Sequence, residues 1–284
     1  MCDQAVIEGQ IKRLILLTYL TPFHEIACIL TLLVCIVAVL AVAGAGCTGT
    51  TQAGGDELKD SYIVGIDGSY APFSYVDKDG NAQGFDVDSM RWIAEKKGIN
   101  VTFKAIDWDA IIPSLQAGKI DMVYAGMTIT PERLEAVNFS NPYWTVNQDV
   151  AVREDSNVTL DDVLAGKAVL GAQRGCTAAT WIEKNLIETG KMPAANLKLY
   201  VDTPAAVSDL EIGRIDAVMY DDLSLGSYIE GKPLKIIGSV ETKEQFGVAI
   251  RKEDTALLEF MNEALAELQA DPYWEELKEK YNLN

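Results

Sequence analysis

Histidine and cysteine are scarce after residue 47. The single histidine, His24, and four of the five cysteines lie within the first 47 residues, which leaves Cys176 alone in the remainder. A lone cysteine forms no internal disulfide, and without histidine neither a Ser-His-Asp nor a Cys-His catalytic pair is possible there. Because no spacing resembles a metal site, we expect no metal and no cofactor.

Positive charge is also scarce. The chain has 24 lysines and arginines against 42 aspartates and glutamates, for a formal net charge of −18. Nucleic-acid binding needs basic surface that neutralises phosphates, so this balance argues against a nucleic-acid partner. It fits a soluble, outward-facing protein. The length of 284 residues allows two lobes of roughly 100–150 residues each.

The first 47 residues have the pattern of a signal or anchor segment. Lys12-Arg13 gives a basic start, and residues 26–46 are apolar without a charge, as in a signal sequence or a single membrane helix. Gly44-Ala45-Gly46-Cys47 resembles a lipobox, with glycine where leucine is usual. We expect lipid on Cys47, or the uncleaved helix, to be the membrane anchor, and residues 48–60 to be a flexible tether.

From Tyr62 onward, short apolar runs alternate with amphipathic stretches. This alternation predicts an α/β fold. Residues 63–66 and 101–104 are expected strands, and residues 86–97 and 110–116 are expected helices.

A short repeat supports two lobes of similar build. Gly118-Lys119-Ile120-Asp121 and Gly213-Arg214-Ile215-Asp216 share one pattern, and an apolar strand follows each. Each glycine ends an apolar-periodic helix. The strand after each repeat leads to a candidate ligand residue at its carboxyl end, where open α/β sheets bind their ligands.

Two segments have features of anion binding. Thr130-Pro131 is expected to begin a helix, which places Arg133 in the first turn, where the helix dipole disfavours a cation. An arginine there indicates an anion in front of it, or else a surface carboxylate such as Glu132 or Glu135. At residues 173–177 a strand runs into a helix start, whose free N–H groups make a small anion site.

A carboxylate complements these segments. The strand expected at residues 216–221 ends on Asp221, which either meets a ligand cation or is the N-cap of the next helix. Two anion-binding segments and one carboxylate describe a receptor for a zwitterion, and an α-amino acid fits. Cys176 is either a small residue in the pocket wall or a thiol whose pKa the helix start lowers.

Six motifs occur in the order typical of one family. They are residues 67–73, 84–88, 108–115, 125–133, 173–177 and 220–221. With them, about residues 60–284 resemble the polar amino-acid family of extracytoplasmic (periplasmic-type) solute-binding proteins, which feed ATP-driven (ABC) importers. The resemblance implies a two-lobed α/β fold of the periplasmic-binding-protein type (type II), with two crossover hinge strands and the ligand in the interlobe cleft. Lobe 1 would comprise residues 61–145 and 242–284, and lobe 2 residues 146–241.

The resemblance also implies how the main chain of an amino acid is held. Arg133 grips the carboxylate, and the Thr177 N–H completes that site. Thr128 adds its hydroxyl and N–H. The Gly126 carbonyl accepts a hydrogen bond from the ammonium, and Asp221 pairs with the same group.

Other residues would contact the ligand side chain. Tyr70 and Trp108 align with the aromatic pair that sandwiches it, Asp67 points to its distal polar group, and Gln173 lies at the pocket mouth. Asp86 is expected as a helix cap nearby. A carboxylate with two rings favours a cation, so we expect arginine or lysine, or else glutamine or histidine.

The predicted function is therefore that of a binding protein and not of an enzyme. It would act as a monomer outside the cytoplasmic membrane and present an amino acid to a membrane permease. One alternative is a cyclohexadienyl-type dehydratase on the same fold, for which Asp67 is the candidate general acid. The other is a ligand-sensing ectodomain, which would need a partner chain.

Overall fold

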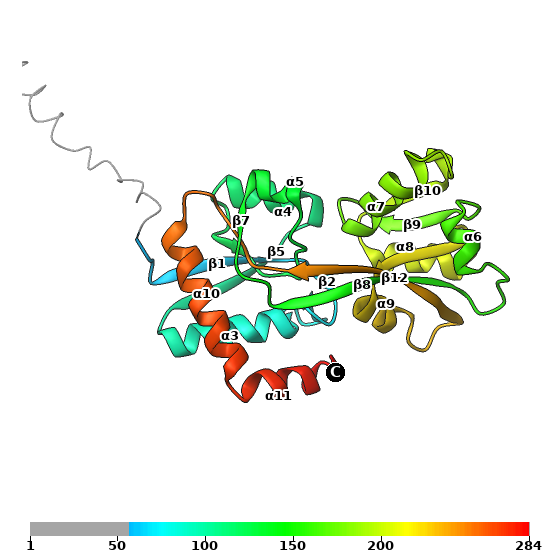
Figure 1. The fold of residues 1–284 in the computed structure, drawn as a ribbon. Helices are drawn as coiled ribbons and strands as arrows, with labels where there is room; N and C mark the ends of the chain where they lie inside the picture. Colours follow the sequence, from blue (N-terminus) through cyan, green and yellow to red (C-terminus); the bar gives the residue numbers. More distant parts are fainter. Residues whose placement is uncertain (1–56, 284) are drawn as a thin grey trace, which may run out of the picture. The chain divides into compact units, whose positions relative to one another are not determined.

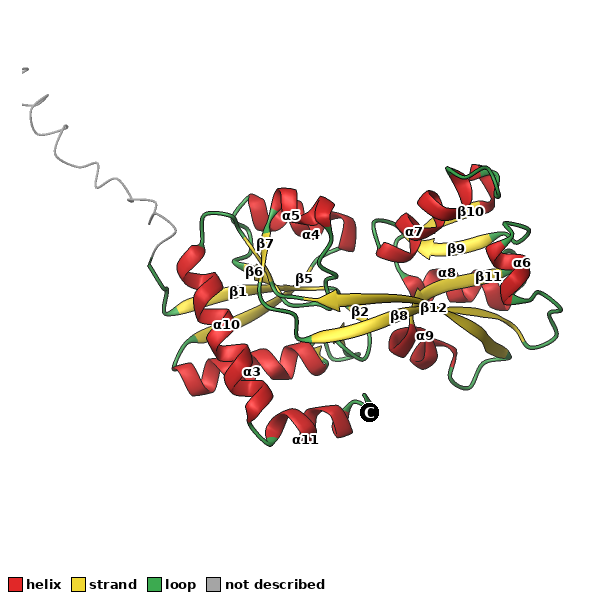
Figure 2. Cartoon of the chain, viewed as in Figure 1, coloured by secondary structure: helices red, strands yellow, loops and turns green. Residues whose placement is uncertain are grey.

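The computed structural model describes residues 57–283, drawn in Figures 1 and 2. The predicted leader with Cys47 and all but the last residues of the tether lie outside the described residues. Within residues 57–283 the chain forms two five-stranded sheets with helices packed on them, together with a three-stranded sheet. No helix in this part is long and apolar enough to span a membrane.

The first sheet has the strand order β5-β1-β6-β13-β7. Strand β1 is parallel to β5 and β6, and β13 is antiparallel to β6 and β7. We call this sheet and its helices the first lobe. Its elements are β1 (Ser61–Ile66), α3 (Phe85–Lys97), β5 (Asn100–Ala105), α4 (Trp108–Gln116), β6 (Met122–Val123), α5 (Pro131–Ala136), β7 (Asn138–Phe139), β13 (Ala249–Ile250), α10 (Thr255–Ala270) and α11 (Tyr273–Lys280), with the small sheet of β2 (Ser69–Tyr70), β3 (Ser74–Val76) and β4 (Ala82–Gln83).

The second sheet repeats this topology in the order β10-β9-β11-β8-β12. Strand β9 is parallel to β10 and β11, and β8 is antiparallel to β11 and β12. We call this sheet and its helices the second lobe. Its elements are β8 (Trp144–Arg153), α6 (Leu160–Leu164), β9 (Leu170–Gln173), α7 (Thr177–Ile182), a π-helix (Glu183–Ile187), a 3₁₀ turn (Ala194–Asn196), β10 (Leu197–Tyr200), α8 (Thr203–Glu211), β11 (Ala217–Asp221), α9 (Asp222–Ile229) and β12 (Leu234–Phe246).

Strands β8 and β12 carry the chain between the lobes, as Figure 2 shows. They pair antiparallel from Arg153 opposite Leu234 to Trp144 opposite Phe246. Phe246 also forms a β-bridge with Thr128 of the first lobe, and β13 of the first sheet follows shortly afterwards. The predicted lobe limits at 145/146 and 241/242 fall inside these two strands.

The repeated aspartates anchor equivalent strands in the two sheets, β1 in the first and β9 in the second. Asp121 accepts a hydrogen bond from the Ile63 N–H at 2.8 Å, and Asp216 accepts one from the Val169 N–H at 2.8 Å. Asp121 thus satisfies a backbone N–H within β1, and Asp216 satisfies one just before β9. The repeat seen in the sequence therefore marks equivalent helix-to-strand junctions.

The antiparallel strand of each sheet brings an arginine to the same junction. Arg251, just after β13, donates from Nη1 to the Ile120 carbonyl at 2.7 Å. Arg153, the last residue of β8, donates from Nη1 to the Ile215 carbonyl at 3.0 Å. The two lobes therefore share their pattern of strand pairing. They also share an arginine that donates a hydrogen bond to the isoleucine carbonyl at the helix-to-strand junction.

Two glycines make room for the isoleucines of the repeat. A Cβ atom on Gly65 of β1 would lie 2.4 Å from Ile120 Cδ1, and one on Gly171 of β9 would lie 2.5 Å from Ile215 Cδ1. Both distances are shorter than van der Waals contact allows. Strands β1 and β9 therefore each lack a side chain at the point where the isoleucine packs against them.

Candidate functional site

The predicted ligand residues lie where strands of the two sheets end. Gln173 and Asp221 are the last residues of β9 and β11. Asp67 directly follows β1, and Gly126 lies three residues after the end of β6. Seven of the nine predicted residues line one cavity between the lobes. The lining of this main cavity is Tyr70, Trp108, Ala125, Gly126, Thr128, Arg133, Cys176, Thr177, Tyr220 and Asp221.

The other two predicted residues, Asp67 and Gln173, line a neighbouring cavity of about 240 Å³, which also reaches Trp108. The main cavity measures only about 10 Å³. That volume suffices for about one water molecule. An amino acid therefore enters only if the lobes move apart. A wider cleft of about 710 Å³ adjoins Arg133 between α5, α7 and β12.

Direct hydrogen bonds hold the lobes together at this point. Trp108 Nε1 and Arg133 Nη2, from the first lobe, each donate to the Gly175 carbonyl at 3.1 Å. Tyr228 of the second lobe donates its hydroxyl hydrogen to the Ser69 carbonyl. The described arrangement is thus a closed cleft in which side chains of one lobe satisfy groups of the other.

The predicted helix start at Arg133 is confirmed. Thr130 is the N-cap of α5 and its hydroxyl accepts from the Arg133 N–H at 3.2 Å, with Pro131 at the first helical position. The guanidinium lies over the Trp108 ring and donates to the Thr128 carbonyl at 2.8 Å. Burial lowers the pKa of Arg133. Glu132, the alternative partner, pairs with Lys184 instead.

Asp221 faces the same cavity from the second lobe. It occupies the N-cap position of α9, but its side chain makes no capping hydrogen bond. Its carboxylate accepts instead from Tyr70 Oη at 2.7 Å and from Gln148 Nε2 at 2.5 Å. Burial, followed by the negative charge of Glu244, raises the pKa of Asp221 to about 7.

Asp67 and Gln173 form part of the contact between the lobes. Asp67 accepts from the Ser69 N–H at 2.9 Å and from Gln173 Nε2 at 3.2 Å. Tyr220 Oη donates to Gln173 Oε1 at 2.7 Å. Gln173 is therefore buried and does not lie at a pocket mouth. Burial also raises the pKa of Asp67.

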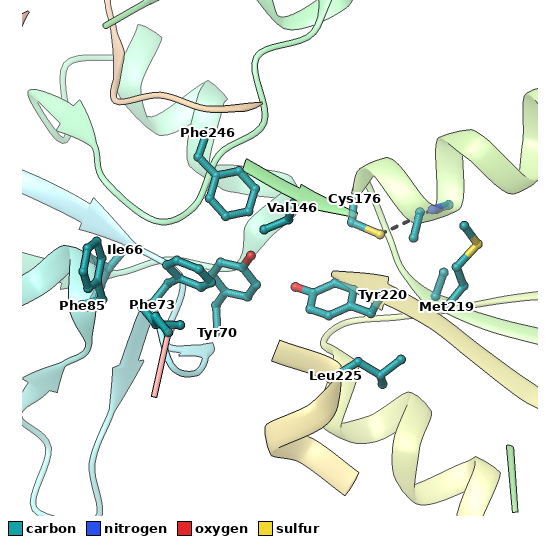
Figure 3. Close-up of a cluster of buried hydrophobic side chains, with 14 of the residues drawn as sticks. Ile66, Tyr70, Phe73, Phe85, Val146, Cys176, Met219, Tyr220, Leu225 and Phe246 are labelled. Atoms are coloured by element: carbon teal, nitrogen blue, oxygen red, sulfur yellow. Dashed lines mark hydrogen bonds between the residues drawn. The ribbon is translucent and has the colours of Figure 1, made fainter. Parts of the chain in front are cut away.

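Tyr70 and Tyr220 line the main cavity from the two lobes, and Figure 3 shows them in a cluster of buried side chains with Phe73. Tyr70 stacks on Phe73 with ring centroids 5.3 Å apart and meets the Tyr220 ring edge-on at 5.8 Å. Gly126 has a φ of +57°, and a Cβ there would lie 2.2 Å from Tyr70 Cε1. The backbone conformation and the approach of this ring both require glycine at position 126.

Asp86 is not the helix cap that the sequence indicated, because Gly84 is the N-cap of α3. The Asp86 carboxylate is fully buried and accepts from the Gly126 N–H at 2.7 Å and from Tyr143 Oη at 2.9 Å. Asp86 does not line the main cavity, but it fixes the backbone of Gly126, which does. Burial without a nearby cation raises the pKa of Asp86 to about 8.

Cys176 is a residue of the cavity wall, as one of the two interpretations proposed. It is the N-cap of α7, and its sulfur accepts from the Ala179 N–H at 3.4 Å. Burial raises the pKa of this thiol to about 12. The interpretation as a thiol with a lowered pKa is therefore wrong.

Gln148 and Glu244 belong to the site but were not predicted. Gln148 is fully buried and donates to both Asp221 and Glu244. Gln148 lies between Val146 and Val150 at alternate positions of β8, so an amide on an otherwise apolar face of a strand was a usable signal. Glu244 gave no such signal. Within residues 57–283, no group of three or more His, Cys, Asp or Glu side chains is arranged to hold a metal ion.

The chain is similar to known bacterial proteins that bind solutes outside the cell. Residues 62–284 match the model of the bacterial extracellular solute-binding proteins, family 3. The L-cystine-binding protein TcyJ of Escherichia coli strain K12 is 31% identical over 227 residues, which cover 78% of this chain and 83% of that protein.

Two solved structures are also similar. An ancestral arginine-binding protein bound to arginine is 35% identical, with a TM-score of 0.72 over 79% of this chain and 99% of its own. An ancestral amino-acid-binding protein described as a precursor of cyclohexadienyl dehydratase is 33% identical, with a TM-score of 0.70 over 78% and 95% of the two chains.

Proposed function

The chain belongs to the bacterial extracellular solute-binding proteins, family 3, and from that membership we propose that it captures a basic L-amino acid for an ABC importer. The observation that carries the proposal is the placement of Arg133 and Asp221. They line one cavity from opposite lobes, so a carboxylate and an ammonium on a single carbon atom can meet both.

Charge in and around the cavity favours a ligand with an additional positive charge. Arg133 is the cation of the cavity lining, whereas three carboxylates, Asp67, Asp221 and Glu244, lie in or beside it. Among residues 57–283, none of these three forms an ion pair with a lysine or arginine. A basic side chain directed toward Asp67, between Tyr70 and Trp108, would offset part of this excess.

In this proposal the lobes, 61–145 with 242–284 and 146–241, close on the amino acid. Arg133, with the Thr177 N–H, would take the carboxylate. Asp221, Thr128 and the Gly126 carbonyl would take the ammonium. Closure is favoured because these contacts form together only when both lobes reach the ligand.

A screen of the twenty L-amino acids against the full-length protein tests the proposal. Thermal unfolding is measured with each amino acid, and calorimetry follows for those that stabilise. We expect arginine or lysine to raise the melting temperature most, since a ligand bound only by the folded state stabilises it. Tighter binding of glutamate than of arginine would contradict the charge argument. The relative that binds cystine makes cystine a necessary addition to the screen.

Delivery and anchoring complete the proposal. We expect the protein, as a monomer, to present its ligand to a membrane permease from the outer face of the cell membrane. Lipid on Cys47 would tether it there. Mass spectrometry of the membrane fraction should find lipid-modified Cys47 at the amino terminus, whereas an intact segment 26–46 would indicate a helix anchor.

A dehydratase is the second candidate, and the raised pKa of Asp67 favours it. Burial raises the pKa of this carboxyl group, which is the direction that suits a general acid. Incubation of the protein with a cyclohexadienyl amino acid, followed by absorbance of the aromatic product, tests this activity. An Asp67→Asn variant that abolishes product formation would support the enzyme.

A further inference from the structure

A second carboxylate, Glu244, reaches the Asp221 side of the cleft from β12. Its Oε2 accepts a hydrogen bond from Thr128 Oγ1 at 3.0 Å, and its Oε1 accepts one from Gln148 Nε2 at 3.0 Å. The same Gln148 nitrogen donates to Asp221 Oδ1 at 2.5 Å. One buried amide therefore joins two carboxylates, and one of these also holds the Thr128 hydroxyl.

A bulge in β12 places Glu244 there. Val240 pairs with Gln148 and Glu244 pairs with Val146, so residues 241–243 stand against the single residue Asn147. Within the bulge, Lys243 has a φ of +52°, which is unfavourable for a residue other than glycine. Asn147 Oδ1 accepts the Lys243 N–H at 3.1 Å and supports this turn. A strand that only linked the lobes would need neither the bulge nor the strained residue.

The hydrogen bonds of Glu244 also determine which hydrogen-bond donors and acceptors remain free to meet a ligand in the cavity. The hydroxyl hydrogen of Thr128 is directed to Glu244, so the lone pairs of that oxygen remain for a donor in the cavity. The two hydrogens of the Gln148 amide are shared among Glu244, Asp221 and, at 3.4 Å, Thr177 Oγ1. Among the described residues, neither carboxylate has a lysine or arginine partner in an ion pair.

We propose that Glu244 is a positioning residue for the α-ammonium of the ligand. It orients Thr128 Oγ1 as an acceptor, fixes Gln148 against Asp221, and adds its negative charge to that of Asp221. This inference rests on the proposed function, since it concerns the same amino-acid site. It extends that site to the strand that joins the lobes.

The test compares Glu244→Gln with Glu241→Gln in the full-length protein. Glu241 lies three residues earlier in the same strand, and its side chain is exposed beside Lys243. The probes are L-arginine and its 2-hydroxy analogue, in which a hydroxyl replaces the α-ammonium, and affinity is measured by calorimetry. We expect Glu244→Gln to weaken L-arginine binding about tenfold, as for loss of a charged partner, and to leave the analogue within about twofold. Glu241→Gln should change neither probe.

A second measurement needs no ligand. Loss of the Glu244 charge should lower the pKa of Asp221, so the fall in ligand-free stability as pH rises from 5 to 8 becomes smaller. We expect the melting temperature of Glu244→Gln at pH 8 to exceed that of the unmodified protein by about 2–4 °C. The other titratable groups that face this pair are unchanged in the variant; they are Tyr70, Arg133, Cys176, Tyr220 and Asp222.

The outcomes separate the two proposals. Equal loss of both probes, or a melting temperature lowered at every pH, would mean that Glu244 is only structural. L-Arginine binding by Glu244→Gln that matches Glu241→Gln would overturn the inference and leave the proposed function intact. Failure of the unmodified protein to bind any amino acid would overturn both.

Discussion

Tyr70 donates its hydroxyl hydrogen to Asp221 across the cleft, with 2.7 Å between the oxygen atoms. In the ligand-free protein, Tyr70 of the first lobe thus donates to Asp221 the kind of hydrogen bond that we propose the ligand ammonium donates when it binds. The bond also lowers the desolvation cost of a buried carboxylate in the ligand-free protein. Ligand and Tyr70 therefore compete for Asp221.

The Tyr70→Phe variant should bind the amino acid at least as tightly as the unmodified protein. Removal of the hydroxyl abolishes a hydrogen bond of the ligand-free closed form and keeps the ring. A typical net value of about 0.5–1.5 kcal/mol per hydrogen bond sets the upper limit of the gain. Calorimetry with L-arginine measures it, and a loss of more than tenfold would mean that the hydroxyl itself contacts the ligand.

Arg133→Ala and Asp221→Ala should each weaken binding by about 2–5 kcal/mol, because each leaves one end of a buried zwitterion unpaired. Calorimetry on both variants checks this. Arg174→Ala is a suitable control, since its side chain lies near Asp109 at the exposed rim. A variant of Arg133 or Asp221 that stays within twofold of the unmodified protein would remove that residue from the site.

Asp67→Asn should discriminate between ligand classes. The amide keeps the shape of the side chain but loses the charge, so affinity for arginine should fall far more than affinity for glutamine. Titration of both amino acids into this variant and into the unmodified protein gives the comparison. Equal losses would show that Asp67 acts through its contact with Gln173 and not through the ligand.

Asp86 should make the ligand-free protein less stable as pH rises. Its pKa is about 8 in the folded protein, above the ordinary value of 3.8, so its contribution is complete below about pH 4 and lost as pH approaches 8. In Asp86→Asn the amide is uncharged at every pH. The melting temperature of Asp86→Asn should therefore exceed that of the unmodified protein by several degrees at pH 8.5 and match it near pH 4.5. Parallel pH profiles would contradict this expectation.

Gly65→Ala and Gly171→Ala should each destabilise the protein by about 1–2 kcal/mol, because the new methyl group overlaps an isoleucine. Shortening that isoleucine should restore the fit. In denaturant unfolding, Gly65→Ala with Ile120→Val, and Gly171→Ala with Ile215→Val, should cost less than the sum of their single variants. Gly226→Ala is the control, since its Cβ would meet no atom within 4 Å. Additive losses would exclude the overlap.

Local signals in the sequence predicted the elements that carry the site. The family resemblance, the fold class and the solute-binding class are confirmed by the family match and the solved structures. The strands at 63–66 and 101–104 and the helices at 86–97 and 110–116 are confirmed, with no end more than two residues from its predicted place. Apolar periodicity sufficed for these, and Thr130-Pro131 marked the start of α5.

Residues placed by contacts between distant segments could not be predicted in this way. Asp86 lies two residues after Gly84 at a helix start, a place typical of a cap, but its carboxylate accepts from the N–H of Gly126, 40 residues later in the chain. Glu244 lies in a polar run that is typical of an exposed connection, and only the bulge against Asn147 turns it inward. Neither effect leaves a periodic pattern in the sequence.

The double crossing of β8 and β12 also determines the order in which the sheets become complete during synthesis. Strand β13 lies between β6 and β7 in the first sheet, yet it leaves the ribosome after every strand of the second sheet. Until then β6 and β7 have no strand between them with which to pair. Amino-terminal units generally fold first during translation, but here the sheet that begins first is finished last.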